Sequence, residues 1–488
     1  MSSKEQLLHV IFLPYMAPGH MMPMVDIARL FAAHGVRATI ITTPMNAQRF
    51  KTTVDREIKA GRHIALEILP FPSVPGLPQG WENLSDTPTP EMSMRLFRAI
   101  NLLQPQIESL FRAIRPDCIF SDVLFHWTVD IAIELGIPRL AFSGSGFFNL
   151  SVAFAVECHG PHKNVDSESE SFLVPSLPNK VSLTGSQLPD IVKTKTKFSE
   201  MFEKLKVAER KSFGMVVNSF DVLESAYADY YRKAIGIKAW GIGPVSLFNQ
   251  EEADKAERGD MATINIDRYL NWLDSKGQNS VLYVCFGSLT RFNKTQLAEI
   301  AGALEDTHCS FIWVVPKVLK TNDDKEEEEW WLPDGFEERT EKSGKGMVVK
   351  GWAPQVLILE HPAIGGFLTH CGWNSILEGV TTGVPMVTWP TIADQFFNEK
   401  LVTQVLKFGV PVGNEYWKVW ATEETLLIGR EKISSAVNTV MNGGKEAEEM
   451  RSVARRISES AKKAVEEGGS SYNDLKTLIQ DIKLYRQK

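Results

Sequence analysis

Few residues in this chain are suited to binding a metal or forming disulfides. Among 488 residues there are five cysteines, which are far apart in the sequence and form no Cys-x-x-Cys pair. This usage indicates neither a zinc site nor a disulfide framework, and a reducing compartment is the default. An Asp-x-Asp element, which chelates a divalent cation in many enzymes, is also missing. We therefore expect no metal.

Long apolar runs and a strong charge bias are absent as well. The formal net charge is −7, with 43% apolar and 23% charged residues, so nothing favours a nucleic acid or an anionic membrane as partner. The apolar run near the N-terminus has about eight residues, too few to span a bilayer. No small-residue cleavage site follows it, which argues against a signal peptide. We expect a cytoplasmic, monomeric protein with no integral membrane segment.

The beginning of the chain has the pattern of a βαβ unit. The apolar run 8–14 predicts a strand, 22–34 an amphipathic helix, and the β-branched run 38–43 a second, parallel strand. The loop 16–20 then lies at the carboxyl end of the first strand, where open α/β sheets bind ligands. It lacks the G-x-G-x-x-G spacing, which disfavours a nicotinamide or flavin cofactor.

Two polar residues are expected at this sheet edge, His20 and Asp122. His20 falls in the loop after the first strand, and Asp122 ends a second predicted strand, 116–122, before a helix over 128–135. If both strands belong to one parallel sheet, the carboxylate can orient the imidazole and make it more basic, as proton abstraction from a hydroxyl requires. The alternatives are a surface or capping role for His20 and an N-cap role for Asp122.

The rest of the chain predicts a second α/β domain. The length predicts about two or three domains, and the charged, apolar-poor stretch 246–274 predicts a linker. A strand over 280–286 follows, with Asn293 as cap of the next helix. Two loop-rich stretches, 70–100 and 143–205, carry scattered aromatic residues, which either line an apolar acceptor cleft or belong to ordinary satellite core. We infer two similar α/β domains facing across a cleft.

Residues 352–395 concentrate groups that suit a nucleotide-linked sugar. Trp352 follows a strand, where its indole can either stack on a planar base or pack at an interface. The turn from His370 leads into a helix start that can receive phosphate. Ser375 and Glu378 fit a capping box, S-x-x-E, so they either close that helix or, for Glu378, meet a ribose. Without an Asp-x-Asp, His370 and the helix dipole would stabilise a leaving diphosphate.

This 44-residue stretch resembles the signature box of the plant family-1 glycosyltransferases that modify secondary products. Matching elements outside it are Pro18-Gly19-His20, Asp122, Gly136-Ile137-Pro138-Arg139 and Phe286-Gly287-Ser288. The resemblance implies a GT-B fold, an α/β architecture of two Rossmann-like domains. It also implies an acceptor-binding domain over 1–245, a linker over 246–274, a UDP-sugar-binding domain over 275–470, and a final helix, 471–488, that packs back on the first domain.

The resemblance further implies an inverting, metal-independent sugar transfer in which UDP-sugar is a co-substrate and no cofactor takes part. His20 is then the general base and Asp122 its partner. The implied donor contacts are Trp352, Ala353, Gln355 and Glu378 for uracil and ribose, Ser288, His370, Asn374 and Ser375 for the diphosphate, and Trp373, Asp394 and Gln395 for the sugar. In this family a glutamine at position 395 is associated with UDP-glucose and a histidine with galactose.

For the small-molecule acceptor, the resemblance is to the branch that glycosylates triterpenoid or steroidal sapogenins, saponins and flavonoids. We expect a triterpenoid or saponin hydroxyl, with a flavonoid as the alternative. Two other classes compete with this interpretation. An NAD(P)-dependent oxidoreductase should show G-x-G-x-x-G after a first strand, and neither domain does. A non-catalytic nucleotide-sugar-binding protein would have no reason to retain both His20 and Asp122.

Overall fold

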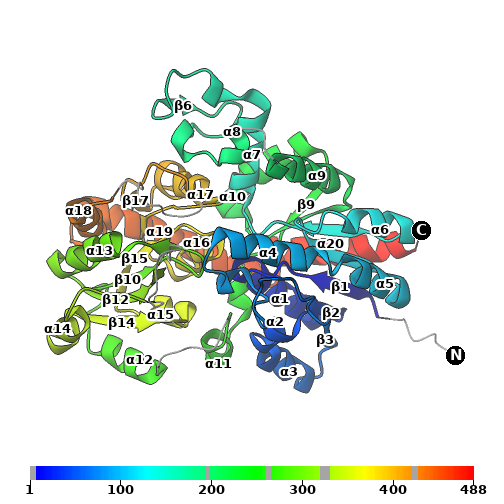
Figure 1. Cartoon of the computed structure of the whole chain (residues 1–488), viewed down its shortest axis with the longest axis horizontal. Coiled ribbons are helices and arrows are strands. Elements are labelled where there is room, and N and C mark those ends of the chain that lie inside the picture. The colour runs from blue at the N-terminus through cyan, green and yellow to red at the C-terminus, as the bar shows by residue number, and fades with distance from the viewer. Residues whose placement is uncertain (1–6, 194–196, 260–264, 319–329, 419–426, 488) are drawn as a thin grey trace. The chain divides into compact units, whose positions relative to one another are not determined.

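Two parallel sheets, each covered by helices, organise the chain in the computed structural model, which describes residues 7–193, 197–259, 265–318, 330–418 and 427–487. The chain separates into two units, each built on one of these sheets (Figure 1). The first contains residues 1–146, 196–260 and 463–488, and the second residues 147–195 and 261–462. The predicted α/β class with two Rossmann-like sheets is confirmed.

The first unit has a sheet of seven parallel strands in the order β3-β2-β1-β4-β5-β8-β9 among its described residues. The strands are β1 (His9–Leu13), β2 (Arg37–Thr42), β3 (Ile64–Ile68), β4 (Cys118–Asp122), β5 (Arg139–Phe142), β8 (Gly214–Val217) and β9 (Lys238–Gly241). The helices are α1 (Pro18–Ala33), α2 (Pro44–Gln48), α3 (Lys51–Lys59), α4 (Pro90–Asn101), α5 (Gln104–Ile114), α6 (Thr128–Leu135), α9 (Lys197–Lys211), α10 (Asp221–Ile235), α11 (Glu252–Ala256) and α20 (Ser470–Arg486).

Strand β1 lies inside this sheet and is buried on both faces. Its side chains alternate, so Phe12 joins a cluster with residues of α1 and α20, while Ile11 and Leu13 join another with residues of α4, α5 and α6. Double burial explains why the segment reads as a continuous apolar run rather than an alternating one. The sequence therefore predicts both ends of the strand to within one residue.

Helix α1 begins four residues earlier than the sequence indicates. The helix was expected from position 22, but it starts at Pro18, which occupies its first turn. Proline has no N–H to lose there and its fixed φ suits the helix, so Pro18 starts the helix rather than breaking it. His20 therefore lies in the first turn of α1 and not in a loop.

The two stretches expected to be loop-rich also contain helices. Residues 90–101 form α4, which begins after Thr89, whose hydroxyl accepts a bond of 3.3 Å from the Met92 N–H. Residues 147–159 form α7 and 197–211 form α9. The two stretches are therefore less irregular than expected, and the Thr89 cap before the amphipathic run 90–101 is a helix signal that the sequence already contains.

Helix α20 packs against β9, inside the first unit. Its apolar stripe, Leu475, Leu478, Ile479 and Ile482, is buried in the same cluster as β1 and α1. Polar contacts fix its ends: the Ser471 hydroxyl donates to the Gly243 carbonyl at 2.5 Å, and Arg486 pairs with Asp117 at 3.1 Å. Hydrophobic burial and end contacts together hold the C-terminal helix on the sheet.

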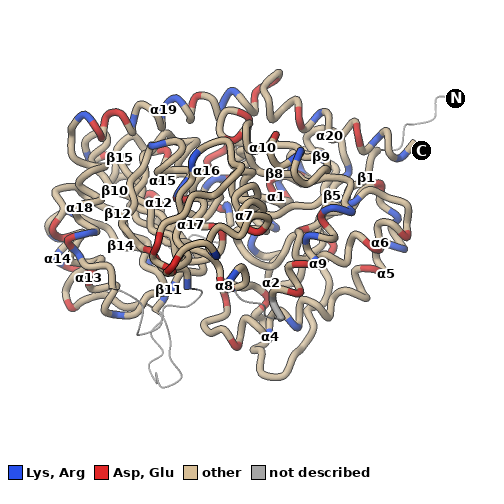
Figure 2. Tube along the Cα trace, turned by 90° about the horizontal axis from the view of Figure 1, so that it is seen from above, with Lys and Arg blue, Asp and Glu red and all other residues tan. Residues whose placement is uncertain are grey.

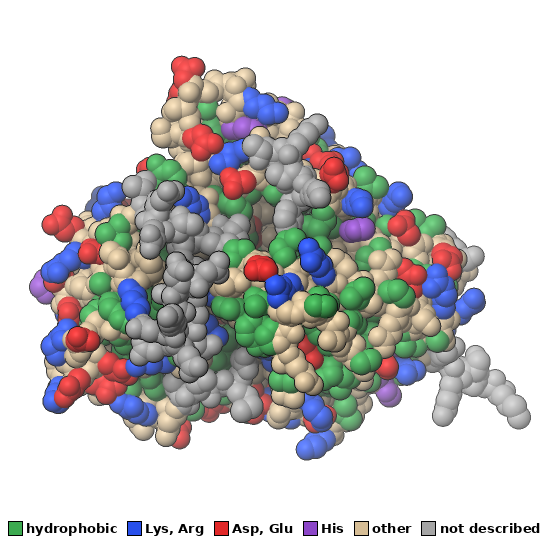
Figure 3. Space-filling model, viewed as in Figure 1, with side chains coloured by type: hydrophobic (Ala, Val, Ile, Leu, Met, Phe, Trp, Pro, Cys, Tyr) green, Lys and Arg blue, Asp and Glu red, His purple; other side chains and the backbone are tan. Residues whose placement is uncertain are grey.

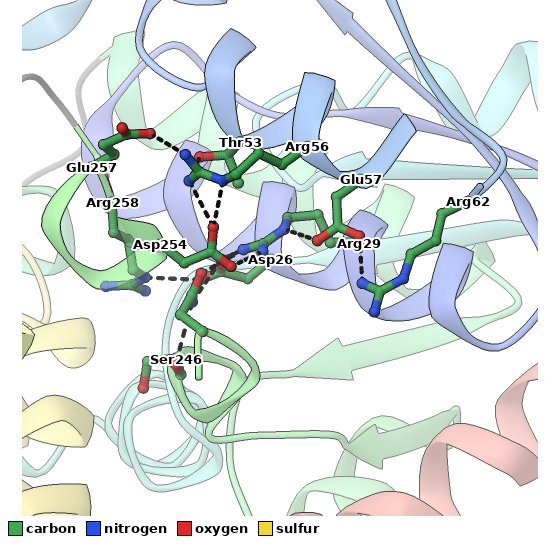
Figure 4. Close-up of polar contacts among 11 residues, drawn as sticks. Asp26, Arg29, Thr53, Arg56, Glu57, Arg62, Ser246, Asp254, Glu257 and Arg258 are labelled. Carbon is green, nitrogen blue, oxygen red and sulfur yellow. Dashed lines mark hydrogen bonds and ion pairs between the residues drawn. The ribbon is translucent and has the colours of Figure 1, made fainter. Parts of the chain in front are cut away.

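The stretch 246–274, expected to be a linker, is partly bound to the first unit. Figure 4 shows charged residues of 249–258 meeting α1 and α3. Asp254 pairs with Arg29 and with Arg56, both at 2.6 Å, and Arg258 pairs with Asp26 at 2.9 Å. The Arg29 side chain is 2% exposed and that of Arg56 33%, so the network extends from the core to the surface. Residues 266–274 form α12, and 260–264 lie outside the described residues.

The second unit has a six-stranded parallel sheet in the order β14-β12-β10-β15-β16-β17 within its described part. Its strands are β10 (Val281–Cys285), β12 (Ser310–Val315), β14 (Gly346–Lys350), β15 (Ile364–Thr369), β16 (Met386–Thr388) and β17 (Gly409–Pro411), with β6 (Ser171–Leu173), β7 (Ser182–Thr184), β11 (Arg291–Phe292) and β13 (Lys317–Val318) in two small ladders. Its helices are α7 (Phe147–His159), α8 (Asp190–Lys193), α12 (Ile266–Asp274), α13 (Lys294–Asp306), α14 (Phe336–Lys342), α15 (Gln355–Glu360), α16 (Trp373–Thr382), α17 (Gln395–Lys400), α18 (Arg430–Met441) and α19 (Lys445–Val465).

The core of this unit is formed largely by β10, β12, α13 and α18. Asn293 caps α13 as expected, because its side-chain oxygen accepts from the Gln296 N–H at 2.8 Å. The same glutamine bonds the carbonyl and N–H of Ile428 at 2.9 Å, which ties α13 to the segment before α18. Local capping and long-range packing thus hold the same helix.

Charges of both signs are interspersed over the described surface. Lys and Arg alternate with Asp and Glu along α19 in Figure 2, and both signs mix on the face seen in Figure 3. Such mixing produces no strong field for a polyanion. In the parts of the chain that the structure describes, no helix combines the length and apolarity needed to cross a bilayer.

Candidate functional site

The structure brings His20 and Asp122 together in the first unit. Strands β1 and β4 are parallel neighbours, with Leu13 opposite Ser121, so α1 starts beside the end of β4. The Nδ1 atom of His20 lies 2.6 Å from the Oδ2 atom of Asp122. The His20 side chain is 29% exposed, whereas that of Asp122 is fully buried. A buried carboxylate therefore faces one ring nitrogen of an accessible imidazole.

Asp122 does not cap the following helix. Its Oδ1 atom accepts from the Leu124 N–H at 3.0 Å, and α6 begins after Trp127, which makes no side-chain cap. The N-cap interpretation of Asp122 was therefore wrong. Each carboxylate oxygen has its own partner, one on the backbone and one on His20, so the group is fixed in direction.

Two neighbours of His20, Tyr15 and Gly144, were not predicted from the sequence. The Tyr15 ring lies 5.9 Å from the His20 ring in an edge-on arrangement, and burial raises the pKa of its hydroxyl, so Tyr15 stays neutral. Gly144 has φ 72°, and a Cβ on it would lie 3.4 Å from His20 Nδ1. The Ser-Gly-Ser-Gly run after β5 could have indicated this close approach, because glycine has no Cβ and readily adopts a positive φ.

In the second unit, three of the predicted donor contacts lie beyond the ends of adjacent strands. Ser288 follows β10, His370 follows β15 and Asp394 follows β16. These strands pair in that order, with Cys285 opposite Thr369 and Thr369 opposite Thr388. Parallel pairing places their carboxyl ends at one edge of the sheet, where α/β folds bind ligands.

His370 is held in this edge by two glycines. A Cβ on Gly287 or on Gly372 would come within 2.5 Å of the His370 Nε2 atom. The side chain keeps part of its exposure, but its ring is packed closely enough that burial lowers its pKa to about 4, against a smaller opposite effect of the Cys285 backbone. At neutral pH His370 is an uncharged imidazole, so it can donate a hydrogen bond but supplies no positive charge.

Three further residues, Gln355, Ser375 and Glu378, form one cluster. The Gln355 Nε2 atom donates to Glu378 Oε2 at 2.6 Å and to Ser375 Oγ at 3.1 Å. Helix α16 starts at Trp373 after Gly372, with no side-chain cap. Ser375 and Glu378 are therefore inside the helix, and the capping-box interpretation was wrong. Glu378 faces α15 rather than the start of its own helix.

Asp394 and Gln395 begin α17. Gln395 is 5% exposed, and its Oε1 atom accepts from the Thr391 N–H at 2.8 Å, the Thr391 hydroxyl at 2.9 Å and the Ile392 N–H at 2.9 Å. The carboxamide oxygen is thus used to hold the turn before the helix. Its amide nitrogen is the group left for a ligand.

The remaining predicted contacts differ in exposure. Trp352 follows β14, at the far edge of the sheet from β16, and is half-buried, whereas Ala353 is 7% exposed. Trp373 and Asn374 begin α16, where backbone N–H groups point out of the helix end. Trp373 is 3% exposed, so most of its indole belongs to the core.

A metal centre was not expected from the sequence. Over the described ranges, no three His, Cys, Asp or Glu side chains are grouped as a metal ion would require. The side-chain groups gathered at the sheet edge are neutral or anionic hydrogen-bonding groups. They suit hydroxyls and a base edge, and the start of α16 suits phosphate.

Two Rossmann-like units are the architecture of the GT-B class of fold, and the solved structures with which this chain superposes share it. Residues 260–447 match the family model described as UDP-glucoronosyl and UDP-glucosyl transferase. The chain is 47% identical to the scopoletin glucosyltransferase of Nicotiana tabacum, covering 98% of both chains. It is also 47% identical to UDP-glucose flavonoid 3-O-glucosyltransferase 7 of Fragaria ananassa, over 98% of this chain and 96% of the other.

A solved structure gives the same result. UGT73P12 of Glycyrrhiza uralensis, complexed with glycyrrhetinic acid 3-O-monoglucuronide, superposes with a TM-score of 0.93 at 45% identity, covering 99% of this chain and 97% of the other. The chain therefore belongs to the plant family-1 UDP-glycosyltransferases and is an enzyme of that family. This excludes the oxidoreductase and the non-catalytic binding protein as interpretations.

Proposed function

We propose that the protein transfers glucose from UDP-glucose to a hydroxyl of an apolar plant metabolite, with inversion at the anomeric carbon and His20 as general base. The observation that carries this proposal is the 2.6 Å contact between His20 Nδ1 and Asp122 Oδ2. Family membership supports the use of a UDP-sugar, and the contact supports the means of activating the acceptor.

The pair favours one tautomer of His20. Because the Asp122 carboxylate accepts, the Nδ1 atom carries the proton and the lone pair lies on Nε2. Nε2 can then take the proton of an acceptor hydroxyl as its oxygen attacks the anomeric carbon. The imidazolium that results is stabilised by the buried carboxylate, as in other His–Asp pairs.

The second unit would hold the donor. Trp352 is proposed to stack on uracil, Glu378 with Gln355 to meet the ribose region, and the start of α16 with neutral His370 to meet the diphosphate. Negative charge that develops on the leaving UDP would be stabilised by N–H groups and the helix dipole rather than by a cation. Asp394 and the Gln395 amide nitrogen are proposed to contact the sugar.

For the acceptor we propose a triterpenoid or saponin hydroxyl. The support is the 0.93 TM-score to the Glycyrrhiza uralensis protein, which was solved with a triterpenoid glucuronide. A flavonoid is the second candidate, since the Fragaria ananassa relative named for a flavonoid is 47% identical. Independence from metal, a cytoplasmic location, a monomeric state and the division of acceptor and donor between the two halves are further parts of this proposal.

The test is the substitution His20→Ala. Transfer to hydroxyl acceptors should fall by about 10²–10⁴-fold, the usual contribution of a general base, while UDP-glucose binding measured by calorimetry stays within twofold. The exposed His63→Ala serves as the matched control. If turnover by His20→Ala equals that of the wild type, His20 has no part in the mechanism.

The acceptor is tested by a mass-spectrometric screen. UDP-glucose, UDP-galactose and UDP-glucuronate are each paired with a triterpenoid glucuronide, its aglycone and a flavonoid, with and without a chelator. We expect the highest turnover with UDP-glucose and a triterpenoid acceptor, unchanged by the chelator. Preference for the flavonoid would replace the acceptor proposal, and loss of activity rescued by magnesium would contradict metal independence.

A further inference from the structure

A buried arginine lies directly behind the His20–Asp122 pair. Arg139 opens β5, the strand next to β4, and is 2% exposed. Its Nη2 atom donates to the Asp122 carbonyl at 3.1 Å, and its Nε atom to the Ser121 hydroxyl at 3.0 Å. The same guanidinium reaches Ser212 at 2.7 Å through Nη1. Arg139 therefore contacts the two residues that end β4, one of which orients the proposed base.

Arg139 donates hydrogen bonds to neutral groups. These groups are two serine hydroxyls, a backbone carbonyl and the Thr128 hydroxyl, which lies 3.2 Å from Nε. Burial lowers the pKa of the guanidinium to about 10, so it remains charged at neutral pH, and the charges of Asp122 and Glu209 favour that charged form. A buried cation without a directly paired carboxylate is costly to keep. The charges of Asp122 and Glu209 offset part of this cost.

We propose that Arg139 is a positioning residue for the His20–Asp122 pair. Its hydrogen bonds fix the end of β4, and its buried positive charge keeps the pair from taking up a proton before the acceptor binds. This inference rests on the proposed role of His20 as the base. Arg139 does not touch the reacting atoms; it acts through Asp122. A neutral residue of the same volume would retain the packing and lose this effect.

Other titratable groups near this region come from two loops and two helices. Tyr15, in the β1–α1 loop, stays neutral because burial raises its pKa. Glu209 of α9 has its pKa raised by burial and accepts a hydrogen bond from Tyr231 of α10. His126, between β4 and α6, has its pKa lowered by burial and by the Lys204 and Arg139 charges. Arg139 is thus the fully buried cation of this group.

The sign of the expected effect follows from charge. Proton uptake by the pair changes its charge from −1 to 0, whether the proton resides on the imidazole or the carboxylate. A nearby cation opposes that uptake, because it attracts the pair more strongly in its anionic state. Removing the cation should therefore let the pair become protonated at a higher pH. The acidic limb of the kcat/KM profile, where the protonated base is inactive, should move upward.

The experiment compares pH profiles of kcat/KM for the wild type, Arg139→Met and Arg139→Lys, with UDP-glucose and the best acceptor from the screen. Arg139→Met should move the midpoint of the acidic limb upward by about one pH unit. Arg139→Lys keeps the charge and should restore the midpoint while leaving turnover reduced. Ser212→Ala removes one hydrogen bond from Arg139 without changing charge, and serves as the matched control with the wild-type midpoint.

A second variant keeps the test decisive if Arg139→Met does not fold. Arg139→Gln is also neutral, but its amide can still donate to the Ser121 or Ser212 hydroxyl, so it should fold and move the midpoint upward as Arg139→Met does. Equal loss of activity at all pH values in Arg139→Met, or an unmoved midpoint in the folded Arg139→Gln, would overturn the proposal and leave Arg139 a structural residue. Failure of His20→Ala to lose activity would instead remove the proposed function itself.

Discussion

Two histidines of the molecule show how the surroundings set the chemistry of one side chain. His20 has a carboxylate at 2.6 Å and remains 29% exposed, so it can exchange a proton with a substrate and carry the charge that results. His370 is packed against two glycines, and burial lowers its pKa to about 4. The first is suited to proton transfer and the second only to hydrogen bonding.

Gln395 provides a test at the same scale. Because its Oε1 atom is occupied by Thr391 and Ile392, only its amide nitrogen can face a sugar. Gln395→Glu keeps the accepting oxygen and replaces the nitrogen by an oxygen. We expect kcat/KM for UDP-glucose to fall about tenfold or more, because the hydrogen bond from the amide nitrogen is lost. The thermal unfolding midpoint should fall modestly, because a carboxylate replaces a neutral group at a buried position.

Two more variants separate the functions of this glutamine. Thr391→Val removes the hydroxyl contact with Oε1 but leaves the two N–H donors, so its activity should remain within about threefold of the wild type. Gln395→His should raise the ratio of UDP-galactose to UDP-glucose turnover, as the association of histidine with galactose implies. Wild-type kinetics in Gln395→Glu would mean that the amide nitrogen does not contact the donor.

At the scale of elements, strand ends explain what the sequence could predict. Continuous apolar runs identify β1, β4 and β10 within two residues, because buried parallel strands have that pattern. Once parallel order is assumed, His20 and Asp122 must lie at one edge. The local role of a residue is harder to predict: Ser375 and Glu378 fit a capping box in sequence, yet α16 begins before them.

Other elements depended on contacts that a single sequence does not contain. Glu378 is directed to α15 by Gln355, a partner 23 residues away. Residues 249–258 look like a solvated linker because they are charged, but their partners Asp26, Arg29 and Arg56 lie on α1 and α3. The sequence shows that these residues are charged, but only the tertiary structure shows that their partners bury some of them.

Helix α20 offers a test of the packing at this scale. Leu478 is fully buried on the first sheet, whereas Leu484, on the same helix, is 47% exposed. Leu478→Ala should lower the free energy of unfolding of the first unit by about 2–5 kcal/mol, the range for buried leucines. Leu484→Ala should change it by less than about 0.5 kcal/mol. Urea unfolding followed by circular dichroism measures both. Equal effects would mean that α20 is not packed as described.

At the scale of the whole molecule, each unit contains a histidine whose neutral form is favoured by folding. In the first unit, burial and the Arg37 charge lower the pKa of His9 to about 4, and in the second unit burial does the same for His370. An unfolded histidine has a pKa near 6.5, so between about pH 6.5 and 4 the unfolded chain binds more protons. Stability from these two groups is complete above pH 6.5 and is lost as the pH falls.

The melting temperature should therefore fall as the pH is lowered from 7 to 4.5, and by less in His9→Gln. Glutamine can keep the 2.9 Å contact with Thr39 but does not titrate. Buried carboxyls with a raised pKa, such as Glu209 and Glu399, act in the opposite direction, yet they are common to both proteins and cancel in the difference. The exposed His63→Gln is the control. If the wild type and His9→Gln lose the same number of degrees, folding does not favour neutral His9.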